Sequence, residues 1–185
     1  MFSLFKRRPP AERLAQKIRW IAEAIGQPDV FVERAKQVAS ELGPGSIPQL
    51  AKQFHAEHSP PPELAAQFSR LGQWIAARQR AIFEIFFFFG ESAIPVLRRV
   101  AFGKYDWTQG NAVEVLCRLA AEGINTDATV AEIRAALPKM RSEALLYGFG
   151  PLLHRAALDA NLAQLLNRFA DIPEYNEAVD ELKSA

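Results

Sequence analysis

Apolar residues recur at steps of three and four positions along almost the whole chain. The first two series, separated by Gly26-Gln27-Pro28, are Leu14, Ile18, Ile21 and Ile25, then Phe31, Ala35, Val38 and Leu42. This spacing places side chains on one face of an α-helix. No segment alternates apolar and polar residues for long enough to predict a β-strand. The pattern therefore predicts an all-α protein.

The longest apolar series predicts one helix from Glu63 to Phe89. Its members are Leu64, Phe68, Leu71, Ile75, Ile82, Ile85 and Phe89, with Arg78 as the single interruption. Farther along, Thr129-Val130-Ala131-Glu132 fits a capping box and predicts a helix start. The phrase Gly148-Phe149-Gly150-Pro151 is typical of one helix ending and another beginning. It separates a predicted helix ending at Tyr147 from one over 151–169.

A short phrase occurs twice in the chain. Segments 43–50 and 90–97 share the pattern Gly-x-x-x-Ile-Pro-x-Leu at a separation of 47 residues. Each copy is followed by a turn and then by a second run with helical periodicity. A helix-turn-helix unit that recurs every 40 to 47 residues is typical of α-solenoids. The phrase therefore predicts two stacked helical hairpins.

The second copy carries a family resemblance. Segment 93–97, the turn at Asp106-Trp107 and the helix over 111–119 together resemble a HEAT repeat, and the first copy is similar with a longer proline-rich turn. The resemblance covers roughly residues 30–137 and implies a HEAT/armadillo-like array of helical hairpins, an α-α superhelix. Two departures are Gln109-Gly110-Asn111, where such repeats often carry an Arg, and Ile172-Pro173, which repeats only two residues of the phrase. A compact irregular helical bundle is the alternative.

These elements predict a single all-helical domain over residues 1–185. Residues 1–10 form a flexible basic start, and 11–42 form N-terminal capping helices. Residues 43–137 form the repeat-like hairpins, and 138–185 form C-terminal helices that either continue the stack or fold back across it.

Composition indicates a soluble protein. The chain is 49% hydrophobic and 23% charged with a net charge of +1, which is ordinary for a globular domain. Its single cysteine, Cys117, lies among apolar residues and suits a reducing compartment as a small core residue. The densest apolar run, 82–89, is too short to span a bilayer, and the start of the chain does not fit a signal peptide. We expect a cytoplasmic protein with no transmembrane segment.

The chain carries no catalytic motif of a known hydrolase, nucleotide-binding or metalloprotease type. His55 and His58 lie three residues apart beside Glu57, a spacing that suits two metal ligands, but no further ligand is nearby in sequence. Solvated histidines before a triple proline are the simpler interpretation. We therefore predict a non-enzymatic protein with no catalytic residues, no metal and no cofactor.

Two groups of residues are candidates for binding another protein. Arg70, Trp74 and Arg78 are spaced by four, so the predicted long helix places them in one stripe. The alternative is that Trp74 packs in the core while the arginines extend across it to solvent. The second group is Tyr105 and Trp107 in a turn, where Trp107 either faces solvent or fills the gap between two repeats. Tryptophan, tyrosine and arginine are typical of binding hot spots.

The predicted function is a protein–protein interaction module that acts as an adaptor, a regulator or a specific inhibitor, and a homodimer is also compatible with the sequence. The first alternative is a nucleic-acid-binding protein resembling the HEAT-like DNA glycosylases, although the net charge of +1 argues against it. Its basic groove would consist of Arg70, Arg78, Arg98, Arg99 and Lys104. The second alternative is a carrier of small apolar ligands with a cavity lined by Phe83, Phe86 and Phe87.

The N-terminus invites a further hypothesis. Basic residues with apolar neighbours would suit a nucleic acid or a membrane surface, and a frayed basic terminus is the alternative. The residues concerned are Lys6, Arg7, Arg8, Arg13, Lys17 and Arg19, with Phe2, Leu4 and Phe5 as apolar anchors.

Overall fold

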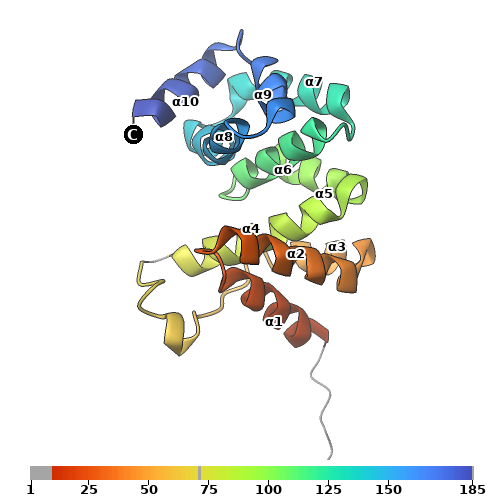
Figure 1. Cartoon of the computed structure of the whole chain (residues 1–185), viewed down its shortest axis with the longest axis vertical. Helices are drawn as coiled ribbons and strands as arrows, with labels where there is room; N and C mark the ends of the chain where they lie inside the picture. The colour runs from red at the N-terminus through yellow and green to blue at the C-terminus, as the bar shows by residue number, and fades with distance from the viewer. Residues whose placement is uncertain (1–9, 71, 185) are drawn as a thin grey trace, which may run out of the picture. The chain divides into compact units, whose positions relative to one another are not determined.

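The structure, a computed structural model, describes residues 10–70 and 72–184, and all regular structure within them is helical (Figure 1). The all-α prediction is confirmed. A membrane-crossing helix would need a longer apolar stretch than any described helix provides. The α-helices are α1 (Pro10–Ala22), α2 (Pro28–Leu42), α3 (Ile47–Ala51), α4 (Gln73–Phe88), α5 (Ile94–Ala101), α6 (Gln109–Ala121), α7 (Thr126–Ala136), α8 (Ser142–Ala156), α9 (Ala160–Asn167) and α10 (Pro173–Ser184).

The chain divides into two compact units, Met1–Ile85 and Phe86–Ala185, with the boundary inside α4. The sequence predicted one domain and no boundary at this point. In the first unit α1 packs against α2. Their predicted apolar faces form this contact, and the residues that are almost fully buried are Ile18, Ile21, Ala35 and Val38.

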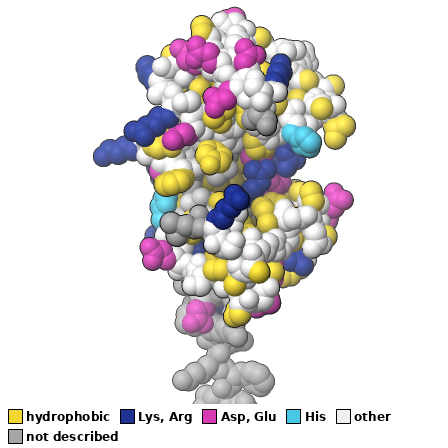
Figure 2. Space-filling view, turned by 90° about the vertical axis from the view of Figure 1, so that its left-hand side faces the viewer, with side chains coloured by type: hydrophobic (Ala, Val, Ile, Leu, Met, Phe, Trp, Pro, Cys, Tyr) yellow, Lys and Arg dark blue, Asp and Glu magenta, His cyan; other side chains and the backbone are white. Residues whose placement is uncertain are grey.

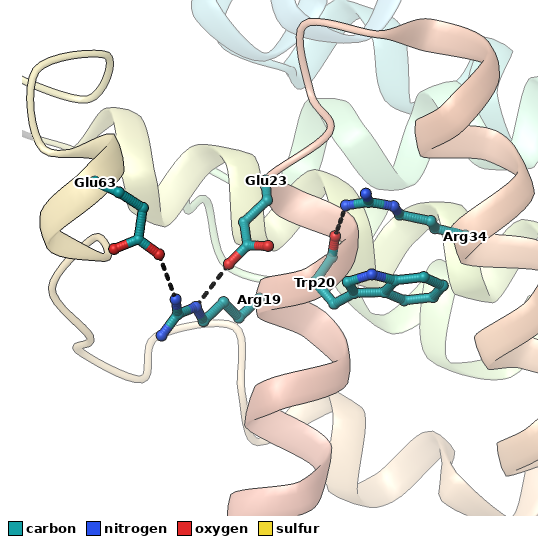
Figure 3. Close-up of polar contacts among 5 residues, drawn as sticks. All are labelled: Arg19, Trp20, Glu23, Arg34 and Glu63. Carbon is teal, nitrogen blue, oxygen red and sulfur yellow. Dashed lines mark hydrogen bonds and ion pairs between the residues drawn. The ribbon is translucent and has the colours of Figure 1, made fainter.

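Polar contacts add to the apolar packing of the first unit (Figure 3). The guanidinium of Arg34 lies 4.8 Å from the centre of the Trp20 ring and donates a hydrogen bond of 2.6 Å to the Trp20 carbonyl, which ties α2 to α1. Arg19, also on α1, pairs with Glu23 at 2.7 Å and with Glu63 at 3.0 Å. Because Glu63 belongs to the short 3-10 turn η2 (Pro62–Leu64), this second pair holds the loop before α4 against α1.

The repeated phrase forms the same local structure in both copies. Each begins with a glycine at positive φ, continues through a 3-10 turn, and enters an α-helix at the isoleucine with proline in the first turn. A positive φ favours glycine, and proline in a first turn removes an N–H that lacks a helical partner. The equivalent residues are Gly43 and Gly90 with φ of 68° and 57°, Ile47 and Ile94, and the fully buried Leu50 and Leu97.

The predicted helix from Glu63 to Phe89 is wrong in its first part. The chain forms η2 and a series of turns there, and α4 begins at Gln73. Gly72 has a φ of 85°, a left-handed conformation that interrupts a right-handed helix. Leu71, which the sequence placed on the apolar face, lies outside the described residues. The capping-box prediction is also wrong: α7 begins at Thr126 after Asn125, and Thr129 lies inside the helix.

In the second unit α6 is the central helix, and nearly all its side chains are buried. It packs against α5, α7, α8 and α9, with α8 lying alongside it (Figure 1). The tightest approach joins Gly110 of α6 to Gly148 of α8. A Cβ on Gly110 would lie 2.7 Å from the Ala144 carbonyl oxygen, and one on Gly148 would lie 3.0 Å from the Gly110 carbonyl oxygen. These two glycines let the backbones of α6 and α8 come into contact.

This contact explains why the predicted helix end at Gly148-Phe149-Gly150-Pro151 is wrong. Helix α8 runs through the whole phrase, with Pro151 inside it. Proline leaves the carbonyl four residues earlier without its helical donor, and that residue is the exposed Tyr147. Gly148 serves helix packing instead of helix termination.

Replacing Gly110 with alanine should destabilise the second unit. The added methyl group would overlap backbone atoms of α8, and overpacking of this kind typically costs about 1–3 kcal/mol. Chemical denaturation of Gly110→Ala against wild type measures the loss. Gly45→Ala is the matched control, because a Cβ there meets no atom within 4 Å and φ is not positive. A Gly110→Ala variant as stable as Gly45→Ala would contradict the close contact.

An ion pair in the second unit should make stability depend on pH. The two terminal nitrogens of Arg134 in α7 each lie 2.7 Å from a carboxylate oxygen of Asp171, in the turn before α10. Hydrogen bonding to Arg134 lowers the pKa of Asp171 to about 2. A lowered pKa stabilises the fold above the ordinary pKa of an aspartate, and this contribution is lost as pH falls towards 2.

We therefore expect the free energy of unfolding of wild type to fall more than that of Asp171→Asn when pH is lowered from about 5 to about 2. Denaturant titrations at several pH values measure both slopes. Asp180→Asn, a change at an exposed position of α10, is the control and should keep the wild-type slope. Equal slopes for wild type and Asp171→Asn would show that the pair does not form in solution.

Candidate functional site

The turn between α5 and α6 is closed by hydrogen bonds on both sides. The carboxylate of Asp106 accepts hydrogen bonds from the backbone N–H of Thr108 at 2.6 Å and from the Thr108 hydroxyl. Beyond it, the buried amide of Gln109 donates to the carbonyl of Ala101 at 2.8 Å. These bonds satisfy polar groups around the helix start. They give Tyr105 and Trp107, which flank Asp106, a defined position.

Tyr105 is hydrogen-bonded to the first turn of α8. Its hydroxyl donates a hydrogen bond of 2.6 Å to the Glu143 carboxylate, and this bond raises the pKa of Tyr105. The guanidinium of Arg141 lies 4.3 Å from the centre of the tyrosine ring, within the range of a cation–π contact. The turn therefore presents an aromatic ring that is already oriented by two charged neighbours.

Two more aromatic side chains of this region face solvent. Trp107 is 77% exposed and Tyr147 is 65% exposed. Tyr147 lies on α8 directly against Gly110, because a Cβ on that glycine would lie 2.9 Å from the Tyr147 Cβ. Trp107 is three residues before the same glycine. We call Tyr105, Trp107, Arg141 and Tyr147 the aromatic surface. The sequence predicted the first two and missed the last two, which come from the N-cap of α8 and from α8 itself.

The predicted stripe of Arg70, Trp74 and Arg78 does not form. Arg70 lies in a bend before Gly72 and is exposed, while Trp74 and Arg78 lie on α4 and are only 4% and 2% exposed. Trp74 packs edge-on against Phe68 with ring centres 4.9 Å apart. The alternative that Trp74 belongs to the core is confirmed. Arg78, however, stays buried instead of extending to solvent.

The residues of the predicted basic groove differ in their exposure and in their partners. Arg78 is buried, and Arg98 pairs with Glu132 at 2.7 Å. Arg70, Arg99 and Lys104 are exposed. On the part of the face in Figure 2 that the structure describes, basic side chains lie among acidic and hydrophobic ones. These observations do not favour the nucleic-acid alternative.

The central phenylalanines each have a packing partner within their own unit. Phe83 stacks on Phe54 at 5.0 Å in the first unit. In the second, Phe86 is fully buried with its ring centre 6.4 Å from that of Phe89, and the Arg118 guanidinium lies 3.8 Å from the centre of the Phe87 ring. Aromatic rings packed in this way stabilise a core. They add no observation in favour of a ligand-carrying cavity.

Cys117, the two neighbouring histidines and the basic N-terminal residues were the other candidates for a functional role. Burial raises the pKa of the Cys117 thiol, which disfavours the reactive thiolate. His55 and His58 are both exposed, and the described residues hold no group of three potential metal-ligating side chains. Of the basic N-terminal residues, Lys17 pairs with Glu41, whereas Lys6, Arg7, Arg8 and the anchors Phe2, Leu4 and Phe5 lie outside the described residues.

No family model, curated protein or solved structure matches this chain. The resemblance to HEAT repeats therefore stays a prediction, and the aromatic surface rests on its own geometry.

The exposure of Trp107 has a direct optical test. The three tryptophans Trp20, Trp74 and Trp107 are 37%, 4% and 77% exposed, so a charged quencher such as iodide should reach Trp107 most readily. Trp107→Phe should therefore lower the Stern–Volmer slope of the intrinsic fluorescence more than Trp20→Phe does, and Trp74→Phe should raise it. An unchanged slope in Trp107→Phe would mean that the indole is covered in solution.

Proposed function

We propose that this chain is a non-enzymatic protein-binding module whose contact region is the aromatic surface. The observation that carries the proposal is that Trp107, in the turn before α6, is 77% exposed, and that Tyr147, which lies on α8 against the first turn of α6, is 65% exposed. Large aromatic side chains contribute most when they are removed from water, and exposed groups of them commonly mark binding sites. The same module would serve as an adaptor, a regulator or an inhibitor of its partner.

The local supports of this surface suit recognition. The turn hydrogen bonds restrict the backbone of the turn, and the Tyr105–Glu143 bond restricts the Tyr105 side chain, before a partner arrives. Pre-organised groups lose less conformational entropy on binding. A complementary partner would offer an apolar pocket to the Trp107 ring and a hydrogen-bond acceptor to its indole N–H. Arg141, above the ring of Tyr105, adds a cation at the same surface.

We further propose that the helices form a HEAT-like array of hairpins. The support is the recurrence of one local structure, glycine at positive φ, 3-10 turn, Ile-Pro helix start and buried leucine, at both copies of the phrase. Arrays of this kind display helix faces and turns on a preformed scaffold. The aromatic surface combines the turn after the helix of the second copy, which carries Tyr105 and Trp107, with Arg141 and Tyr147 at the start of and on α8.

The proposal predicts that Trp107 and Tyr147 dominate partner binding. Partners captured by wild type from a lysate are compared quantitatively with those captured by Trp107→Ala/Tyr147→Ala, and the candidate partner is then purified for titration calorimetry. The double variant should weaken binding by at least about 30-fold, the effect of a hot spot worth about 2 kcal/mol. Circular dichroism confirms that the variant is folded.

Leu158→Ala is the matched control, because Leu158 is 93% exposed but lies in the turn after α8, away from the aromatic surface. It should bind the purified partner as wild type does. Equal losses in the control and the double variant, or no loss in either, would contradict the proposal. Sedimentation of the free protein checks the homodimer: a dimer that the double variant dissociates would identify the partner as a second copy.

A further inference from the structure

Arg78 of α4 is a buried cation that has no carboxylate partner in residues 10–70 and 72–184. The residue is 2% exposed, and its guanidinium donates to two neutral acceptors, the Ala56 carbonyl at 2.7 Å and the Gln53 amide oxygen at 3.5 Å. Removing a charge from water without a counterion costs several kcal/mol. Burial accordingly lowers the pKa of Arg78 to about 10. Within the described residues, nothing neutralises this charge.

Arg19 in the same unit shows the contrast. It forms ion pairs with Glu23 and Glu63 although it is exposed (Figure 3). Its pKa is raised, mainly by the hydrogen bond to Glu23. Surface arginines gain little from such pairs, whereas a buried arginine needs one. In the first unit, therefore, the exposed Arg19 has carboxylate partners, whereas the buried Arg78, which needs a counterion more, has only neutral acceptors.

Arg78 lines a surface hollow of about 250 Å³ within the first unit. Helix α1 contributes Glu12, Ala15 and Arg19 to its walls, the loop before α4 contributes His58, and α4 contributes Trp74 with Arg78. This volume lies just below the usual range of ligand pockets, so the hollow suits only a small molecule. The hollow is partly open to solvent.

Trp74 supplies the second observation. Its indole Nε1 is buried and has no hydrogen-bond partner among the described residues. A buried donor without an acceptor costs about 1–3 kcal/mol. Trp74 and Arg78 both line the hollow, and among the described residues neither the indole N–H nor the guanidinium has a carboxylate acceptor.

We propose that this hollow binds the carboxylate of a small organic acid. The Arg78 guanidinium neutralises the carboxylate, Trp74 Nε1 donates a hydrogen bond to it, and the indole face with Ala15 contacts the apolar part of the ligand. A single negative charge fits best, because Arg19 is already neutralised by its two glutamates and Glu12 at the hollow would repel a dianion.

His58 reports on the site. Burial and the nearby charge of Arg78 lower the pKa of His58, so a bound carboxylate should raise it by offsetting that charge. The other charged groups that line the hollow with His58 are Arg78 on α4 and Glu12 with Arg19 on α1. The chain has only three histidines, and His58→Gln assigns the imidazole signal in proton–nitrogen correlation spectra.

The experiment titrates the full chain with benzoate and, separately, with its neutral analogue benzamide and with inorganic phosphate. Benzoate should produce a saturable shift of the His58 signal and an upward shift of its pKa, while benzamide produces neither. Trp74→Phe, which removes only the indole donor, should weaken benzoate binding about tenfold. Arg78→Gln should abolish it, and Trp107→Ala in the other unit should leave it unchanged.

If Arg78→Gln fails to fold, the benzoate–benzamide comparison and Trp74→Phe still decide the matter. Equal responses to benzoate and benzamide, or no saturable response to benzoate, would overturn the proposal. So would an unchanged benzoate affinity in Trp74→Phe. Tighter binding of inorganic phosphate than of benzoate would overturn the assignment of a carboxylate ligand. A failure here would leave the aromatic surface untouched, because that proposal concerns the other unit.

Discussion

The backbone contact between α6 and α8 is the constraint on which the second unit depends. Two helices with ordinary side chains at their crossing keep their axes about 8–10 Å apart. Gly110 and Gly148 remove the side chains at the crossing and let backbone atoms touch. With this contact, nearly all side chains of α6 are buried. The contact also brings Tyr147 over the start of α6, beside the turn that carries Tyr105 and Trp107. The same close packing that builds the core therefore assembles the aromatic surface at its edge.

Charge is handled differently at exposed and buried positions. Exposed arginines such as Arg19 and Arg134 have carboxylate partners that hold loops and turns against helices. Solvent would stabilise these charges without the pairs, so each pair mainly restricts the position of a segment. Arg78 has only neutral acceptors in an environment where a charge needs compensation most. That imbalance distinguishes the hollow beside α4 from the ordinary polar surface of the first unit.

The sequence predicted the helical class, the first two helices and the repeated phrase because these depend on local patterns. Apolar steps of three and four mark the faces of α1 and α2, and the Gly-x-x-x-Ile-Pro-x-Leu phrase specifies its own turn and helix start. Where the same signals were misread, a tertiary contact or a single backbone conformation decided the outcome. Gly148 looked like a helix end but serves the crossing with Gly110. Gly72 looked like an ordinary position in a long helix but adopts a left-handed conformation.

For the candidate sites too, some features could be predicted from the sequence and others depended on the tertiary structure. The sequence by itself determined which residue types were present for binding and placed Tyr105 and Trp107 in one turn, but it left open whether Trp107 faces solvent, which the structure decides. Only the tertiary structure added Tyr147 and Arg141 to that turn, and only it moved Trp74 and Arg78 from a predicted surface stripe into the interior of the first unit. The physical reason is that periodicity reports which residues share a helix face. What covers that face, and which charges are left without a partner beneath it, depends on segments far away in the sequence.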